Sequence, residues 1–540
     1  MSNTPDFPQS SSKVSISQIQ LDLSSGRWKL FKQSKQIEHY IPKYMCNDFD
    51  ALDACLPYIK VSYDGGKVCS IEAFPGLVRE QPLFFNVTSG VLSIHDSPTV
   101  EPSSTLDDVS ALNWLTFGYA TFDRTLFNNT KSIPASHKLV GQLNSELRIE
   151  PEYVYNSHAE RRGATRTELV SSFMDASEKV FDSLIKASQN KTIILPLSGG
   201  YDSRFIAAML KKGGFSNVKC FAWGRPANED ISISQHIAQK LGYQWQYIDY
   251  STQAWQQVLD NDTYPRLLDM TSGNTCISGV ASLPFLEYLE QQDITGSVMV
   301  FGHSGGFIGG GHLPKSLNDN SSTDDVVSAI FNRHCLYKGG DISPVRDELT
   351  AQVNYLAKHL DKPYRAFEVW DLMERQAKFI VNTNRYYENM QLPWSMPLWD
   401  SRLCDFWATV PPKHKHGLSL YNHALETQVF KPMDIAFPAD KTRSRSPVAN
   451  RLFRLANNPS LLLDKLKGVR ANPYPNDEYG FTWFTNQLRK SAPTHDKALT
   501  DFASKWFQEQ GSPEGKGIYP AIAMYAFLHL AAGTLSQDND

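Results

Sequence analysis

Two glycine-rich segments of this chain combine small residues with side chains that can do chemistry. The first, LSGGYDS, ends at Ser203, and the second, GHSGGFIGGGH, spans residues 302–312. Within the second, Gly302 to Gly306 fits the pattern G-x-S-x-G, in which a sharp turn exposes a nucleophilic serine, here Ser304. Alternatively, the glycines let the backbone approach a ligand closely. The surrounding sequence has to decide between these two interpretations.

The first segment has the residue types of a phosphate-binding loop. Gly199 and Gly200 lead into a helix, so that consecutive backbone N–H groups lie at the positive end of the helix dipole. Ser198 and Ser203 add hydroxyl donors, and Asp202 can hold Mg²⁺ against the same phosphates. A plain helix cap with a tight turn is the simpler alternative. The chain contains no G-x-x-x-x-G-K-[ST] motif, so ordinary γ-phosphate transfer is not indicated.

The elements around this loop alternate between strand and helix. Helical spacing of apolar residues predicts a helix over 165–188, and the continuous apolar runs at 192–197 and 218–223 predict buried strands. Helices follow both runs, and YQWQYIDY and residues 298–301 predict two more strands. We therefore expect an α/β fold with a doubly wound parallel sheet, whose ligands bind at the carboxyl ends of the strands.

The first third of the chain has a different pattern. From about residue 15 to 155, short β-like runs are cut by turn residues, with hairpins predicted at Asp64-Gly65-Gly66 and Thr88-Ser89-Gly90. We expect a flexible N-terminus over 1–14, a mainly β domain over 15–158, and an α/β domain with a helical C-terminal part over 159–540. The apolar run at 518–535 is interrupted by Pro520, His529 and Gly533, which predicts a buried helix and not a membrane span.

Composition narrows the class of protein. The 540 residues carry a net charge of −4 and no concentrated basic run, so nucleic acid and anionic membranes are not expected partners. The seven cysteines are dispersed without a C-x-x-C pair, which favours reduced thiols over disulfides or a zinc site. The N-terminal residues do not resemble a secretory signal. We expect a cytoplasmic protein.

The loop LSGGYDS resembles the ATP-pyrophosphatase loop (PP-loop) of the asparagine synthetase family, which includes β-lactam synthetases, lasso-peptide cyclases and amidating enzymes. The likeness continues through CFAWGRPANEDISISQHIAQKLG and NTNRYYENMQLPWSMPLWDSRLCDFWATVPP. It implies an adenine nucleotide α-hydrolase-like synthetase domain that turns a carboxylate into an acyl-adenylate, with ATP and Mg²⁺ as cofactors. The ATP-binding residues that it implies are Pro196, Leu197, Ser198, Gly199, Gly200, Asp202, Ser203, Trp223 and Gly302, with Asp202 also holding the metal.

The second loop departs from the family pattern G-x-G-x-D-E-L-x-G-G-Y. Its end glycines match, but Gly306 stands where the second Mg²⁺-binding aspartate belongs, and Phe307 where an acidic residue often follows. The loss of one carboxylate weakens the metal site, because Mg²⁺ favours carboxylate and phosphate oxygens. A catalytically impaired or non-catalytic nucleotide-binding relative is therefore an alternative to an active ligase.

The resemblance also implies three catalytic candidates. His303 occupies the position of a catalytic Glu or Tyr, and an imidazole of near-neutral pKa could serve as a base. Arg385 matches an Asp-Arg pair that binds phosphate or substrate, and Lys441, in FPADKTRSRS, would stabilise the charge that develops on the adenylate. Glu388 is a weaker acid/base candidate, and an ordinary solvated glutamate is the simpler interpretation.

The N-terminal part resembles this family's Ntn-hydrolase-like glutaminase domain, through LVREQPLFF and FGYATFDRTLFNNTKSIPASHKL. The family's nucleophile is an N-terminal cysteine, whereas this chain begins Met1-Ser2-Asn3 and its first cysteine is Cys46. A hydroxyl is far less reactive than a thiol without an organised base. We expect no glutaminase activity, and nitrogen from ammonia or an amine.

The function that fits these observations is an ATP-dependent carbon–nitrogen ligase. Its substrate would be a small-molecule, peptide or sugar carboxylate, and the resemblance is compatible with a homodimer. A serine hydrolase that uses Ser304 is a remote alternative, because the elbow requires a helix directly after the serine and FIGGGHLP predicts none.

Overall fold

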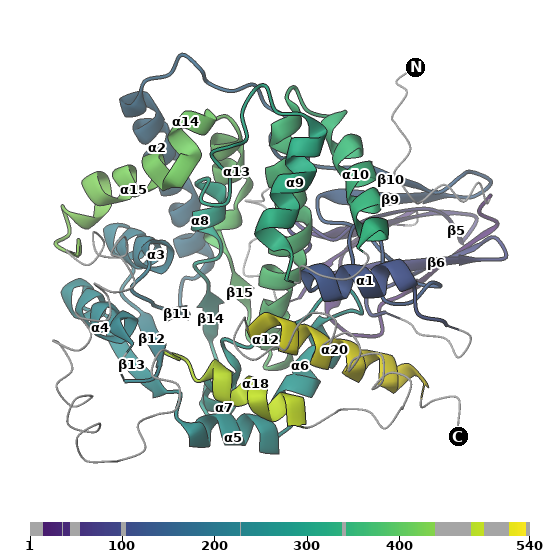
Figure 1. The fold of residues 1–540 in the computed structure, drawn as a ribbon. Helices are drawn as coiled ribbons and strands as arrows, with labels where there is room; N and C mark the ends of the chain where they lie inside the picture. The colour runs from purple at the N-terminus through teal and green to yellow at the C-terminus, as the bar shows by residue number, and fades with distance from the viewer. Residues whose placement is uncertain are drawn as a thin grey trace.

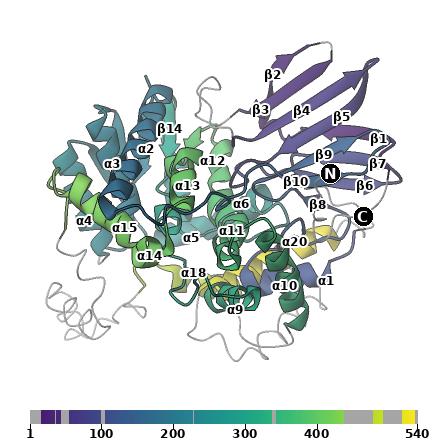
Figure 2. The same ribbon diagram turned by 90° about the horizontal axis from the view of Figure 1, so that it is seen from above.

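The computed structural model describes residues 15–34, 36–43, 55–98, 104–226, 228–336, 342–437, 477–490 and 518–535. Figures 1 and 2 show a β-rich N-terminal part on one side and an α/β part on the other, with helices packed between and around them. The fold is therefore mixed α/β with a mainly β N-terminal part, as predicted.

Two β-sheets build the N-terminal part. One has the order β1-β7-β6-β8 and the other the order β10-β9-β5-β4-β3-β2, and all neighbours are antiparallel except β1 and β7. Their strands are β1 (Gln18–Asp22), β2 (Trp28–Gln33), β3 (Ile37–Pro42), β4 (Tyr58–Asp64), β5 (Lys67–Phe74), β6 (Phe84–Thr88), β7 (Val91–His95), β8 (Lys131–Ser132), β9 (His137–Gln142) and β10 (Arg148–Pro151). Both predicted hairpins are confirmed, as β4–β5 and β6–β7.

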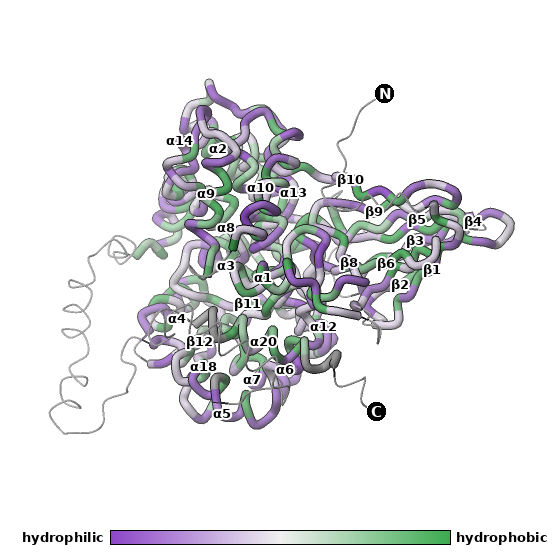
Figure 3. Tube along the Cα trace, turned by 45° about the vertical axis from the view of Figure 1, so that its right-hand side comes forward, coloured by the Kyte–Doolittle hydropathy of each residue, from purple (hydrophilic) through white to green (hydrophobic). Residues whose placement is uncertain are grey.

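The two sheets bury their facing sides against each other. In β4, buried and more exposed residues alternate, and Figure 3 shows the corresponding alternation of hydropathy along the strands of this sheet. A Cβ at Gly141 of β9 would lie 2.4 Å from Leu92 of β7, so the sheets approach closely at this position. One helix, α1 (Asp108–Phe117), interrupts this otherwise β-rich part.

The α/β part is organised around a five-stranded, all-parallel sheet with the order β13-β12-β11-β14-β15. Its strands are β11 (Thr192–Pro196), β12 (Val218–Gly224), β13 (Gln244–Asp249), β14 (Ser297–Val300) and β15 (Trp394–Ser395). The first four were predicted, and β15 was not. Phe221 and Trp223 of β12 contact Phe285 of α7, while α4 also packs on β12. Because successive side chains of a strand point to opposite faces, helices cover both faces of the sheet.

The helices near the sheet were predicted in part: those at residues 166–187, 201–212 and 229–241 were expected, and the others were not. They are α2 (Arg166–Ala187), α3 (Tyr201–Lys212), α4 (Glu229–Leu241), α5 (Thr252–Asp260), α6 (Thr263–Thr271), α7 (Leu283–Glu290) and α8 (Gly305–Ile308). A capping box at Thr165 and Glu168 starts α2, and Gly242 ends α4 with a φ of 72°. These local signals explain why the helix limits could be predicted here.

The remaining helices surround the sheet and reach the N-terminal part. They are α9 (Thr323–His334), α10 (Ser343–Ala357), η2 (Pro363–Arg365), α11 (Ala366–Asp371), η3 (Leu372–Val381), η4 (Asn382–Arg385), α12 (Tyr386–Asn389), η5 (Pro397–Trp399), α13 (Ser401–Ala408), α14 (Pro412–Lys415), η6 (His416–Leu418), α15 (Ser419–Leu425), η7 (Glu426–Phe430), α18 (Phe481–Lys490) and α20 (Ile518–Leu535). Within the described ranges, no helix is long and apolar enough to span a membrane.

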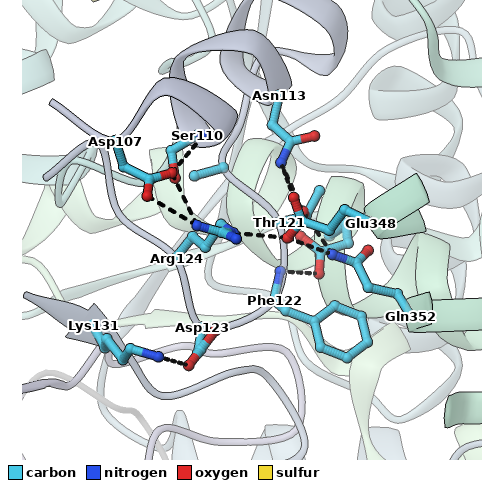
Figure 4. A network of polar contacts seen from close by, with 12 residues as sticks. Asp107, Ser110, Asn113, Thr121, Phe122, Asp123, Arg124, Lys131, Glu348 and Gln352 are labelled. Atoms are coloured by element: carbon cyan, nitrogen blue, oxygen red, sulfur yellow. Dashed lines mark hydrogen bonds and ion pairs between the residues drawn. The ribbon is translucent and has the colours of Figure 1, made fainter. Parts of the chain in front are cut away.

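A network of buried polar contacts ties the N-terminal part to the helices that follow the sheet (Figure 4). Arg124 donates from Nε to Glu348 of α10 at 2.8 Å and from Nη1 to Asp107 at 2.9 Å. Deeper in the interface, Lys378 of η3 donates to Glu374 at 2.8 Å and to the carbonyl oxygens of Ala120 and Phe122. The interface is therefore specified by directional bonds as well as by apolar packing.

Candidate functional site

The two glycine-rich segments meet at the carboxyl end of the parallel sheet. The first follows β11 and the second follows β14, and these strands are neighbours in the sheet. Strands β12 and β13 lie on one side of β11, whereas β14 and β15 lie on its other side. The strand order therefore reverses between β11 and β14. Such a reversal leaves a crevice beyond the strand ends, which is where open α/β sheets bind ligands.

The loop between β11 and α3 is held by its own serines. The backbone N–H of Ser198 donates to Oγ of Ser203 at 3.1 Å, and that of Gly200 donates to Oγ of Ser198 at 3.1 Å. The two hydroxyl oxygens lie 3.1 Å apart. A Cβ at Gly199 would lie 2.5 Å from Oδ1 of Asp230, so a larger residue does not fit there. These contacts fix a compact turn at the start of α3.

The start of α3 has no side-chain cap, like the starts of α6, α7 and α10 and unlike those of several other helices. Helices α1, α2, α4, α5 and α9 each begin with a side chain that accepts a hydrogen bond from the first turn. The cap of α3, Gly200, has no side chain to do so. The first N–H groups of a helix need acceptors, and a bound phosphate supplies them well.

Asp202 points from the first turn of α3 toward the second loop. Its Oδ1 accepts a hydrogen bond from the Tyr421 hydroxyl at 2.8 Å, and its Oδ2 accepts one from the Gly306 amide at 3.0 Å. Burial raises the pKa of this carboxyl, and the hydrogen bonds from Tyr421, Gly306 and Gly305 oppose that rise. A nearby cation would favour the charged form of such a carboxylate, so Asp202 fits the expected metal ligand.

The second loop lies directly against the start of α3. A Cβ at Gly302 would lie 3.0 Å from the backbone nitrogen of Ser203, so only glycine allows this approach without displacement. A single-turn helix, α8, begins immediately after Ser304. The expectation of no helix at this point was therefore wrong. This helix is nevertheless only four residues long. The amide of Gly309 donates a hydrogen bond to the carbonyl of Gly305, so the chain turns back on itself here.

His303 is half-buried beside the second loop. Its ring stacks on Phe301, with ring centres 5.4 Å apart and planes 18° apart. Burial lowers its pKa to about 4, although a hydrogen bond with Asn384 opposes the shift. The expected near-neutral pKa is thus wrong for the free protein. His303 is neutral at physiological pH and suits a hydrogen-bonding role better than that of a strong base.

Aromatic side chains surround Trp223 near the end of β12. Trp223, at the end of β12, stacks on Phe285 with ring centres 4.6 Å apart, and a second near-parallel ring, Tyr250, lies 6.3 Å away. Leu197, one residue beyond the end of β11, donates its N–H to the carbonyl of Phe221 at 2.7 Å. Pro196 is the last residue of β11 itself. The proposed nucleotide contacts of Pro196, Leu197 and Trp223 therefore all sit at strand ends of this crevice.

Arg385 ends η4 and Glu388 lies in the following helix, α12. Asn384 contacts His303, whereas Arg385 interacts with Arg27 and Arg79 of the N-terminal part. Only 3% of Arg385 is exposed, and its Nε lies 3.8 Å from Oε2 of Glu388. Glu388 is buried too and accepts a hydrogen bond from Trp394 at 3.2 Å. The simpler interpretation of Glu388 as a solvated glutamate is therefore wrong, and no described contact joins Arg385 to the phosphate loops.

Some site residues could not be tested or were missed. Lys441 lies outside the described residues, so its role stays a prediction. Tyr421 of α15, which binds Asp202, was not among the predicted residues, and neither was Glu426, which accepts a 2.7 Å hydrogen bond from Tyr201. No motif marks these residues, because they approach the loop from more than two hundred positions further along the chain.

A buried carboxylate and two histidines form a second polar cluster, which sequence reasoning also missed. Asp371 lies 2.6 Å from Nδ1 of His312, the last residue of the second loop, and 3.3 Å from Nε2 of His334. Burial alone would raise the pKa of Asp371, but the two imidazoles hold it well below its usual range. This cluster anchors the end of the second loop to α11.

Comparison with known proteins supports the family resemblance. Residues 186–423 match the family model described as asparagine synthase. No curated protein matches the chain.

Within the described ranges, no group of three or more His, Cys, Asp or Glu side chains is placed to hold a metal ion.

Several solved structures show a distant likeness. An NMN synthetase from Francisella tularensis is 12% identical over 47% of this chain and 96% of that chain. An NH3-dependent NAD synthetase from Campylobacter jejuni, in complex with the nitrate ion, is 12% identical over 51% and 98%. A glutamine-dependent NAD(+) synthetase from Cytophaga hutchinsonii is 10% identical over 56% and 71%. The TM-score is 0.19 in each case, so these likenesses support no conclusion about the activity of this chain.

Proposed function

We propose that this protein is an ATP-dependent amide-forming ligase, which activates a carboxylate as an acyl-adenylate and transfers the acyl group to ammonia or an amine; the match of residues 186–423 to the asparagine synthase family model supports this. The observation that carries the proposal is the position of the Ser198–Ser203 loop. It opens α3 without a side-chain cap, at the point where the strand order of the parallel sheet reverses.

ATP would bind with its phosphates at the start of α3 and its adenine toward Trp223. A carboxylate oxygen of the substrate then attacks the α-phosphorus, and pyrophosphate leaves. In the second step the nitrogen of ammonia or an amine attacks the acyl carbon, and AMP leaves with the electron pair of the broken C–O bond. The free N–H groups of α3 would stabilise the negative charge on the departing pyrophosphate.

Mg²⁺ would neutralise the phosphate oxygens in this reaction. Asp202 is the residue that would hold it, since its carboxylate faces the second loop and needs a positive partner. Gly306 supplies only a backbone N–H at the position of the second acidic ligand. We therefore expect a weaker metal requirement than two carboxylates would create.

His303 would act as a positioning residue rather than as a strong base. Its lowered pKa keeps the imidazole neutral, so it can accept a hydrogen bond from the attacking amine without competing for solvent protons. Asn384 fixes its orientation. Lys441 remains the candidate for stabilising the adenylate. Arg385, by contrast, is assigned no role in the chemical step, because its described contacts lie elsewhere.

The N-terminal part, residues 15–158, would be a degenerate glutaminase-like domain that has kept its fold. Its buried contacts with Glu348, Glu374 and Lys378 make it part of the structural frame of the synthetase domain, which would span 159–540. Nitrogen would then arrive as free ammonia or as an amine on the second substrate.

The test is a product assay on the full chain with ATP, Mg²⁺, panels of amino-acid, uronate and peptide carboxylates, and ammonia, in which AMP and pyrophosphate are measured. Asp202→Ala should abolish AMP formation, whereas Asp319→Ala, a surface partner of Arg162 at 2.8 Å, should not. ATP binding without AMP release from any carboxylate would favour the non-catalytic alternative that Gly306 suggests. AMP formation that survives Asp202→Ala would refute the assignment.

A further inference from the structure

Three arginines converge on one buried point between the N-terminal part and the synthetase domain, away from the phosphate loops. Arg27 directly precedes β2, Arg79 lies in the turn after β5, and Arg385 ends η4. Arg79 is fully buried and Arg385 is 3% exposed, while 15% of the Arg27 side chain is exposed. Figure 2 shows α12, the helix directly after η4, between β14 of the parallel sheet and the strands of the N-terminal part.

These guanidinium groups make few hydrogen bonds. Arg79 donates through Nη2 to Ser132 at 2.8 Å, but its Nε and Nη1 have no acceptor among the described residues. Arg385 donates through Nη1 to Asn382 at 3.3 Å, and Arg27 donates through Nη2 to the carbonyl of Asp96. The Nε atoms of both also lack a hydrogen-bond acceptor in the described structure. Four buried nitrogen donors on charged groups are thus left over within the described ranges.

The nearby carboxylates do not accept hydrogen bonds from the four leftover nitrogen donors. Oε2 of Glu388 lies 3.9 Å from Nε of Arg27 and 3.8 Å from Nε of Arg385, both longer than a hydrogen bond. Its Oε1 is already bound by Gln81 and Trp394. Burial and the positive charges of Arg27 and Arg79 lower the pKa of Arg385 to about 9, against the attraction of Glu388. Glu374 also attracts Arg79, and Asp96 attracts Arg385, but the four leftover nitrogens still have no hydrogen-bond acceptor among the described residues. Buried charged donors are normally hydrogen-bonded, so an acceptor is missing at this point of the fold.

A neighbouring acceptor is also unused. Oε1 of Gln81, on the strand side of Glu388, has no donor among the described residues. An oxyanion that also carries a hydroxyl would satisfy this oxygen together with the arginine donors. Water alone could bridge some of these atoms, but charged guanidinium donors bind an anion more strongly than they bind water.

We propose that a small oxyanion, bearing a phosphate or carboxylate group, binds between Arg27, Arg79 and Arg385 at the domain interface. The site is separate from the ATP loops and does not depend on the ligase assignment. The anion site is nevertheless connected to the second loop, because Asn384 precedes Arg385 in η4 and contacts His303. A bound anion would hold η4 in place through Arg385, and η4 would in turn hold the second loop through Asn384 and His303. The anion would thus act as an effector of the second loop.

The experiment is calorimetric titration of the full chain with sodium phosphate and, separately, with sodium malonate, each against sodium chloride of equal ionic strength. Phosphate and malonate distinguish a phosphate from a carboxylate ligand. Thermal unfolding with increasing anion provides a second measurement, because a ligand of the native state raises its stability. We expect binding of at least one anion, and Kd at least about tenfold weaker in Arg79→Met, which removes charged donors.

Arg27→Met provides a second variant on a partly exposed side chain, should Arg79→Met fold poorly, and it too should weaken binding. Arg124→Met is the matched control, since this interface arginine already binds Asp107 and Glu348. Its Kd should equal that of the wild type. The proposal is overturned if neither anion binds beyond the effect of chloride. It is equally overturned if Arg79→Met and Arg27→Met both bind as tightly as the wild type.

Discussion

The amide of Gly306 donates to Oδ2 of Asp202 at 3.0 Å, and a Cβ at position 306 would lie 3.9 Å from the same oxygen. A side chain at this position therefore starts in ordinary van der Waals contact, beside the carboxylate proposed to hold the metal. The adjacent position is closed: a Cβ at Gly305 would lie 2.3 Å from the Tyr421 hydroxyl and 2.7 Å from Oδ1 of Asp202.

We predict that Gly306→Asp strengthens the metal site. A second carboxylate next to Asp202 repels it in the absence of a cation and binds Mg²⁺ together with it in the presence of one. The Mg²⁺ concentration for half-maximal AMP formation should fall by about tenfold. Gly305→Asp is the control and should lose activity, because its side chain collides with Tyr421. Identical Mg²⁺ curves for the wild type and Gly306→Asp would contradict this prediction.

His303 should make the protein less stable in mild acid. Its pKa is lowered from 6.5 to about 4 by burial, so the unfolded state binds the proton more tightly than the folded state. The stability that neutral His303 contributes is present above pH 6.5 and is lost as the pH falls toward 4, on the order of 2 kcal/mol. Urea unfolding between pH 4.5 and 7 should show a shallower pH dependence in His303→Gln.

A matched control for His303 is His529→Gln, since His529 lies 2.8 Å from the exposed Asp269 and outside the site. It should keep the pH dependence of the wild type. If the free energy of unfolding depends on pH equally steeply in the wild type and in His303→Gln, then His303 is not buried in its neutral form.

Asp371 should be a major source of stability for the second loop. Because its pKa is held well below the usual range, its contribution is present above the unfolded value near 4 and is lost only as the pH falls through the folded value. At pH 7, Asp371→Asn should cost about 3 kcal/mol in the free energy of unfolding, since it leaves His312 and His334 without their carboxylate.

Asp361→Asn is the comparison for Asp371. Its carboxylate pairs with Arg365 at 2.7 Å but is half exposed, so the cost should be about 1 kcal/mol or less. Both values come from urea unfolding at pH 7. Equal costs for the two variants would show that the buried cluster is not a special support of the loop.

Lys378 should be required for the interface between the two parts. Lys378→Met leaves Glu374 buried without its cation, and two carbonyl oxygens without a donor, at a cost of about 3 to 5 kcal/mol. Adding Glu374→Gln to the same variant should recover part of this loss, because the buried charge is removed with its partner. A free energy of unfolding for Lys378→Met that lies within about 1 kcal/mol of the wild-type value would contradict this prediction.

The parallel sheet and the glycine-rich turn between β11 and α3 could be predicted because their signals are local. The apolar run of β11, the glycines before Tyr201 and the capping residues of α2 each specify structure within a few positions. The pairing of β11 with β14 was not predicted, and the two loops were brought together through the family resemblance. The two loops that carry the proposed function could therefore be identified from the sequence.

The rest depends on contacts between distant segments. Tyr421 reaches Asp202 from α15, and Glu388 is buried only because Gln81 and Trp394 meet it from separate parts of the chain. The pKa of His303 follows from its burial, which no motif encodes. β15 is two residues long, too short for a recognisable pattern. Residues of this kind become visible only when the whole fold is assembled.

The most direct test of the account is calorimetric titration of MgATP into the full chain and into Gly302→Val. A side chain at position 302 would begin 3.0 Å from the Ser203 nitrogen and push the second loop away from α3, whereas Gly163→Val, with no atom within 4 Å of its Cβ, serves as the control. We predict that the wild type and Gly163→Val bind MgATP alike and that Gly302→Val binds at least about tenfold more weakly. No binding by the wild type, or equal binding by all three, would contradict the central claim that the two loops form an ATP site.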